Sequence, residues 1–210
     1  MDDHKKYFLR FIQSYYPETA EDILAATEQH FSIISKDIAF VKTSENPLDK
    51  RLDFSGYFLA FIKTLDEKGE TYDNIRKICL EITTAYVQPK SKVEEFVKQL
   101  VPRLIVTWVG QRVVKSFQKK ISGKASADGF VVTIITDKTK TYGLGYGLDI
   151  IECGICKLFG KHNYSHYVPI LCEVDKITSG FAGLELIRTG TIANGGEKCD
   201  FRFKRKQGNQ

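Results

Sequence analysis

The chain has 210 residues, of which 42% are hydrophobic, a share that is ordinary for a globular protein and argues against disorder. The formal net charge of +5 is modest, and the basic runs lack the interleaved aromatic residues of a nucleic-acid surface, so we expect no nucleic-acid partner. No apolar run approaches the roughly 20 residues that cross a bilayer, and the first residues do not form a signal peptide, so we expect a cytoplasmic protein with no membrane partner.

The first 121 residues carry apolar residues at helical spacing. The pattern predicts one helix that ends before Pro17, followed by helices over about 23–42, 48–65, 71–86 and 93–121. Thr71 and Ser91 stand where capping residues are expected. Pro102 should kink or divide the last helix, because proline lacks an amide donor and crowds the preceding turn.

At Ser122 the pattern changes to short β-rich runs. Two strands, in GFVVTIITD and TYGLGYGLDII, are predicted to form a hairpin through Asp137–Lys140, with the glycines of the second run bending a strand. Two short helices follow, at about 152–162 and 165–181. The runs GLELIRTGTIA and EKCDFRFKR alternate like strands, and Asn194–Gly196 between them predicts a hairpin turn.

This order predicts an α+β protein: a helical N-terminal half, then β-β-α-α-β-β with an antiparallel sheet covered on one face by helices. The change at Ser122 divides the chain into a helical region over 1–121 and an α+β region over 122–210. The Gly/Ser/Ala stretch Ser122–Asp128 is the only candidate boundary. It could equally be a turn inside one compact domain.

Three of the five cysteines lie close together in the second half, with a fourth in the last strand. Cys153 and Cys156 are three residues apart, so both sulfurs can point to one side of a helix start. A single CxxC is weak evidence for zinc, but Cys172 and Cys199 could converge on it. The cysteines could be core residues, metal ligands or catalytic thiols, because an odd number in a reducing compartment does not indicate a disulfide framework.

Two charged residues accompany these cysteines. Asp175 lies one helical turn after Cys172, where its carboxylate could act as a general base, although it could also face solvent. Arg188 lies on the same side of its predicted strand as two leucines, so a buried guanidinium there needs an anionic partner. That partner could be Asp200, Glu185 or a bound carboxylate.

From about Gly147 to Phe203 the chain resembles the L-2-amino-thiazoline-4-carboxylic acid hydrolase family. Four features carry the resemblance: Cys153, PILCEVD (169–175), GLELIRTGTIANGG (183–196) and CDFRF (199–203). It implies a small-molecule hydrolase that opens a cyclic isothiourea acid to a carbamoyl-cysteine. The chain is also similar to vinyl-reductase-type domains, which implies a non-catalytic small-molecule-binding or sensory module as the alternative.

The implied reaction needs a nucleophile, a proton donor and an anchor for the substrate carboxylate. In one route Cys172, with a lowered pKa, attacks and Asp175 handles protons. In the other, the resemblance points to Cys153, Cys172 and Cys199 as ligands of a zinc that activates water. In both, Arg188 would bind the carboxylate of the small-molecule substrate, with Thr189 or Asn194 as hydrogen-bond donors. The amphipathic helices could also support a homo-oligomer.

Overall fold

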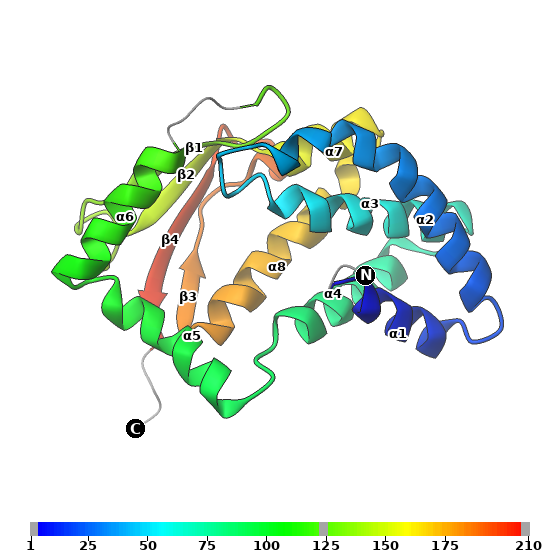
Figure 1. Cartoon of the computed structure of the whole chain (residues 1–210), viewed down its shortest axis with the longest axis horizontal. Coiled ribbons are helices and arrows are strands. Elements are labelled where there is room, and N and C mark those ends of the chain that lie inside the picture. Colours follow the sequence, from blue (N-terminus) through cyan, green and yellow to red (C-terminus); the bar gives the residue numbers. More distant parts are fainter. Residues whose placement is uncertain (1–3, 122–125, 207–210) are drawn as a thin grey trace.

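The computed structural model of the chain describes residues 4–121 and 126–206 (Figure 1). The order of its elements confirms the predicted α+β class. The first half contains α1 (Lys5–Tyr15), α2 (Ala20–Asp37), η1 (Ala39–Lys42), α3 (Arg51–Glu67), α4 (Tyr72–Val87), α5 (Lys92–Leu104) and α6 (Trp108–Ile121). The second half contains β1 (Val131–Ile135), β2 (Gly147–Glu152), α7 (Gly154–Lys161), η2 (Ser165–Tyr167), α8 (Val168–Phe181), β3 (Leu184–Ile187), η3 (Ile192–Asn194) and β4 (Cys199–Arg205).

The four strands form one antiparallel sheet in the order β1-β2-β4-β3. Along β4 the residues Cys199, Phe201 and Phe203 are buried and alternate with more exposed neighbours, as the sequence pattern predicts. Helix α8 lies between β3 and the helical half, where it packs on α4 (Figure 1). This helix therefore joins the sheet to the first half of the chain.

The structure confirms the helix caps and the helix break that the sequence predicts. The side chains of Thr71 and Ser91 each accept a hydrogen bond from the backbone N–H three residues later, at the starts of α4 and α5. The long apolar segment after Ser91 is divided, because α5 ends two residues after Pro102 and α6 begins at Trp108. The two amphipathic helices α5 and α6 result from this division.

Both predicted hairpin connections are longer than expected. The residues from Thr141 to Tyr146 are not strand, because Tyr142, Gly143 and Gly145 have positive φ angles (50°, 82° and 63°) that a strand does not allow. The predicted strand bent by glycine is therefore wrong over this stretch. Between β3 and β4, Gly195 does turn the chain with φ 80°, but it follows η3 within a connection of eleven residues, 188–198.

A buried polar contact ties the segment before α3 to the segment before β1. The Asp49 carboxylate accepts a hydrogen bond from the Phe130 backbone N–H at 2.9 Å, and the Asn46 side chain donates to the Phe130 carbonyl at 3.0 Å. Asp49 also accepts from the Ser44 hydroxyl. These two side chains satisfy the backbone of Phe130 as a neighbouring strand would.

One hydrophobic core crosses both halves. It contains Phe8 and Phe58 from the helical half together with Phe130, Phe159 and Phe201 from the second half. The predicted boundary begins with residues 122–125, which lie outside the described residues. No helix within residues 4–121 and 126–206 is both long enough and apolar enough to span a membrane.

We expect Asp49→Ala to lower the free energy of unfolding by about 2–4 kcal/mol, because it leaves the buried Phe130 N–H and the Ser44 hydroxyl without their acceptor. Urea unfolding followed by circular dichroism measures this loss. Asp53→Ala, in the exposed first turn of α3, is the matched control and should cost less than about 1 kcal/mol. An equal loss in both variants would show that Asp49 does not join the two segments.

Candidate active site

Three of the cysteines predicted as site residues lie close together in the second half of the molecule. Cys153 immediately precedes α7, Cys172 lies in α8 and Cys199 begins β4, and all three line one small cavity of about 20 Å³. Cys156, in the first turn of α7, is close enough to Cys153, Cys172 and Cys199 to interact with each of them electrostatically. We call these four residues the sulfur cluster.

The start of α7 favours the thiolate form of Cys153. Backbone N–H groups in the first turn of a helix lack partners and carry partial positive charge. The Cys156 thiol, followed by the backbone N–H groups of Cys156 and Ile155 and the charge of Arg51, lowers the pKa of Cys153 against the effect of burial. The same contact with Cys153, together with burial, raises the pKa of Cys156. These contacts therefore favour the thiolate form of Cys153 and the protonated form of Cys156.

The other two sulfurs are held as neutral thiols. Burial raises the pKa of Cys172 to about 12, so the lowered pKa expected for this residue is not found. Burial also raises the pKa of Cys199, whose Sγ accepts a hydrogen bond from the Ile192 backbone N–H at 3.2 Å. A low-dielectric environment disfavours a charged sulfur when no donor or cation compensates it fully.

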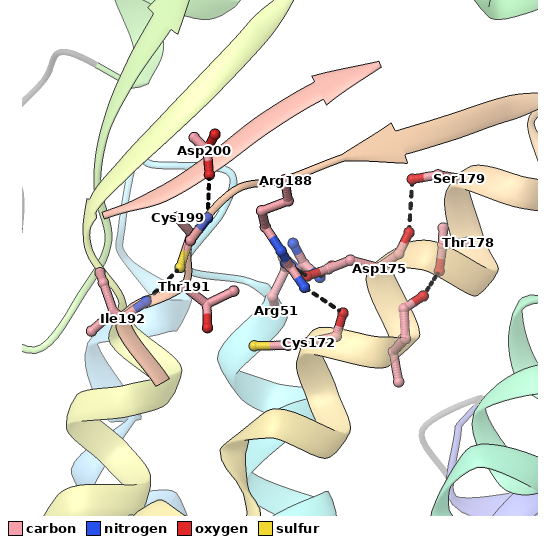
Figure 2. A network of polar contacts seen from close by, with 12 residues as sticks. Arg51, Cys172, Asp175, Thr178, Ser179, Arg188, Thr191, Ile192, Cys199 and Asp200 are labelled. Atoms are coloured by element: carbon pink, nitrogen blue, oxygen red, sulfur yellow. Dashed lines mark hydrogen bonds and ion pairs between the residues drawn. The ribbon is translucent and has the colours of Figure 1, made fainter. Parts of the chain in front are cut away.

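Asp175 lies between two arginines (Figure 2). Its Oδ1 accepts from Arg51 at 2.7 Å and its Oδ2 from Arg188 at 3.2 Å, and its side chain is only 14% exposed. Asp175 therefore does not face solvent, and both oxygens are occupied by cations. Asp175 is the anionic partner of Arg188. The sequence suggested Asp200 or Glu185 as partners within the chain.

The two arginines differ in how much of their surface is accessible. The Arg188 side chain is 6% exposed, donates a second bond to the Cys172 carbonyl at 3.0 Å and lies over the Phe201 ring at 5.0 Å. The Arg51 side chain is 42% exposed. Arg188 is therefore committed to contacts within the protein, and Arg51 has free surface for a ligand.

Thr189 and Asn194 lie outside the sulfur cavity. The Thr189 hydroxyl and backbone N–H both donate to Asp200, at 2.7 and 2.9 Å, and Asn194 is exposed in η3. The structure therefore brings Cys153, Cys172, Asp175, Arg188 and Cys199 together and leaves Thr189 and Asn194 apart from them.

A larger cleft of about 530 Å³ adjoins the sulfur cavity. Five residues line both spaces, namely Arg51, Ile155, Leu171, Asp175 and Phe201. The walls of the cleft carry two stacked ring pairs, Phe54 with Tyr86 and Tyr146 with Phe203. Arg51 and Asp175 thus form a charged border between an apolar cleft and the sulfurs.

The sequence also suggested a zinc site at Cys153, Cys172 and Cys199. In the part of the chain that the structure describes, no three His, Cys, Asp or Glu side chains are arranged to hold a metal ion. The contacts of the sulfurs explain this geometry, since Cys153 interacts with the start of α7 and Cys199 accepts from Ile192. The three cysteines line one cavity, and a zinc bound by them stays a prediction.

Sequence reasoning missed Arg51, which comes from the helical half. One signal was present: Arg51 is the first residue of α3, and a cation at a helix N-terminus is disfavoured by the helix dipole unless an anion compensates it. Here the anion is Asp175, which lies 124 positions further along the chain.

The model of the L-2-amino-thiazoline-4-carboxylic acid hydrolase family matches residues 51–203. The match covers more than half of the chain and runs from Arg51 in α3 to Phe203 in β4, so it contains the whole sulfur cluster and both arginines. None of the curated proteins matches the chain, and none of the solved structures does.

We expect Cys156→Ala to move the titration of Cys153 to higher pH, because the variant removes the thiol that contributes most to the stability of the Cys153 thiolate. The measurement is the rate of iodoacetamide labelling of Cys153 against pH, followed by peptide mass spectrometry. Cys172→Ala is the control and should leave the midpoint unchanged. A midpoint that does not move in Cys156→Ala would contradict the assignment of Cys156 as the donor.

Proposed function

We propose that this chain, which belongs to the L-2-amino-thiazoline-4-carboxylic acid hydrolase family, hydrolyses a cyclic isothiourea that carries a carboxylate. One observation supports the chemistry most directly: the Cys153 sulfur is stabilised as a thiolate beside a cavity bordered by Arg51. A thiolate is the form of cysteine that attacks an electrophilic carbon.

The reaction proceeds in two steps through Cys153. Its thiolate adds to the ring carbon that lies between the sulfur and the two nitrogens, and the bond from that carbon to the ring sulfur breaks. The substrate, now open, remains attached to Cys153 as an isothiourea. Water then adds to the same carbon, and Cys153 leaves as a thiolate, so that the product is a carbamoyl-cysteine type urea.

Cys156 supplies the proton for the first step. Its raised pKa keeps the thiol protonated while Cys153 is a free thiolate. Once the Cys153 sulfur is bonded to the substrate, that negative charge is gone, and Cys156 can protonate the ring sulfur as it leaves. The water that adds in the second step returns a proton to Cys156. Proton transfer from a positioned acid to a leaving group typically accelerates such a step by about 10²- to 10⁴-fold. In this proposal the pair Cys153 and Cys156 replaces Cys172 and Asp175 as nucleophile and proton donor.

Arg51 binds the substrate carboxylate. Its side chain is 42% exposed and lines the cleft, and a planar guanidinium fits a carboxylate through two parallel hydrogen bonds. Asp175 and Arg188 position Arg51, because the Asp175 carboxylate joins the two guanidinium groups. The substrate ring would then lie towards the sulfurs and its substituents in the apolar cleft.

The size of the cleft extends the substrate class. At about 530 Å³ it falls in the range of roughly 300–1,000 Å³ found for sites that enclose whole organic ligands. Its aromatic walls favour an apolar or aromatic group on the substrate. We therefore include thiazoline acids with such substituents among the candidate substrates.

We expect Cys153→Ala to abolish turnover of the thiazoline acid, because the nucleophile is lost. Acid quenching during turnover of the unmodified protein should trap an adduct that carries the full mass of the substrate, since ring opening releases no fragment. Peptide mass spectrometry should place this adduct on Cys153.

Cys172→Ala is the control for this experiment and should still form the adduct. An adduct on Cys172 would overturn the assignment of the nucleophile. Activity that is lost with a chelator and restored by zinc would favour the metal-bound water route instead. Tight binding of the acid without any product would support the alternative of a binding module.

We expect Arg51→Met to lower kcat/KM for the acid by roughly 10- to 100-fold, as the loss of a charge-assisted hydrogen bond predicts. The carboxamide analogue should lose less than the acid, because it offers no charge to Arg51. Any loss common to both substrates reflects the effect of the Arg51 charge on Cys153 and Asp175. Arg51→Lys keeps the charge without the planar fork and should fall between Arg51→Met and the unmodified protein. Equal losses for acid and amide would mean that Arg51 does not bind the substrate carboxylate.

A further inference from the structure

Helix α5 carries an apolar stripe that no other part of the described chain covers. The exposed members of the stripe recur at helical spacing and are Val93, Phe96, Val97, Val101 and Leu104. An apolar face of this kind normally packs on a core. Figure 1 shows α5 and α6 at the outer edge of the molecule, away from α1 and α2.

Helix α6 continues the same surface. Trp108, Val109 and Val113 are exposed on it, and Trp108 is 70% exposed. Val101 and Leu104 of α5 line one open hollow of about 420 Å³ together with Val109 and Val113 of α6. Exposed apolar side chains of the two helices therefore meet at this hollow, and we call the exposed apolar residues of α5 and α6 the α5–α6 face.

Positive charge is concentrated on these two helices. Residues 92–121 contain seven lysines and arginines and two glutamates, so their net charge of +5 equals the formal net charge of the whole chain. Within Trp108–Ile121 there are four basic residues and no acidic ones. Arg112 lies over the Trp108 ring at 4.9 Å, so cation and indole occupy the same exposed surface.

The combination of exposed apolar side chains and positive charge favours some binding partners of the α5–α6 face over others. A second copy of the chain would bring two sets of like charges together, which opposes association. A lipid surface with anionic headgroups complements the lysines and arginines and accepts exposed Trp, Phe, Val and Leu side chains at the boundary of the acyl region.

We propose that the α5–α6 face binds the surface of an anionic lipid bilayer, with α5 and α6 lying in the plane of the interface. The proposal departs from the sequence-based expectation of no membrane partner. The contact is peripheral, so it does not require any described helix to span a membrane. It does not depend on the proposed hydrolase activity. Tyr146 lines both the hollow on this face and the apolar cleft at the candidate active site, so the two spaces share this residue.

Trp108 is the only tryptophan of the chain and reports directly on this contact. We expect its emission maximum to shift to shorter wavelength when phosphatidylcholine vesicles that contain phosphatidylglycerol are added, because the exposed indole enters a less polar environment. Phosphatidylcholine vesicles alone should give little shift. Salt should reverse the shift, because it screens attraction to the headgroups.

Two double variants test the apolar and the basic component separately, with binding measured by vesicle sedimentation. Lys115→Gln with Lys119→Gln should weaken binding roughly 30-fold, because each charge near an anionic surface contributes about fivefold. Val93→Ser with Val97→Ser should weaken it roughly 10-fold or more. The controls Lys138→Gln with Lys140→Gln and Ile33→Ser change exposed residues elsewhere and should bind as the unmodified chain does.

Three results would overturn the proposal. The first is no shift with anionic vesicles, and the second is an equal shift with neutral vesicles. The third is a dimer in light scattering that Val93→Ser with Val97→Ser dissociates while vesicles remain unbound, since a second copy would then occupy the face. Binding of polyglutamate but not of vesicles would likewise assign the face to an acidic protein.

Discussion

The ion pairs of Asp175 with Arg51 and Arg188 hold the candidate site together. They connect the first residue of α3 with the middle of α8 and the residue after β3, so that the helical half is tied to two consecutive elements of the second half. Because Arg188 is almost fully buried, it needs this carboxylate, and removing one member of such a group usually costs more than the group contributes. The same contacts set α8 against the sheet and so fix Cys172 opposite Cys199.

The sequence was sufficient for those parts of the fold that depend on local patterns. Helical spacing, the caps at Thr71 and Ser91 and the break after Pro102 all follow from short-range chemistry. The connection around Gly143 and Gly145 was misread, because alternating glycines and aromatics fit a bent strand as well as a loop with positive φ. A bent strand and a loop differ in which residues pair with β1. The local sequence pattern does not report this pairing.

The sequence predicted part of the candidate site as a set of residues, but it did not predict the roles of those residues. The resemblance pointed to Cys153, Cys172 and Cys199, and these do share a cavity. Burial and the direction of nearby backbone N–H groups determine which cysteine ionises. The spacing of the cysteines in the sequence reports neither of these. Cys153 gains donors from the start of α7, whereas Cys172 lies inside a helix and gains none. Arg51 was out of reach because its partner is distant in the chain.

The charges around the cavity restrict which substrate can meet the Cys153 thiolate. Two guanidinium groups face one carboxylate and, when Cys153 is ionised, its thiolate, so the charges of the cavity are then balanced before a ligand arrives. A simple carboxylate would add an uncompensated negative charge next to that thiolate. For the proposed substrate, a cyclic isothiourea acid, protonation of the amidine would balance the carboxylate and avoid this cost. In the proposed reaction the same proton would make the ring carbon electrophilic, so the balanced form of the substrate would also be the reactive form.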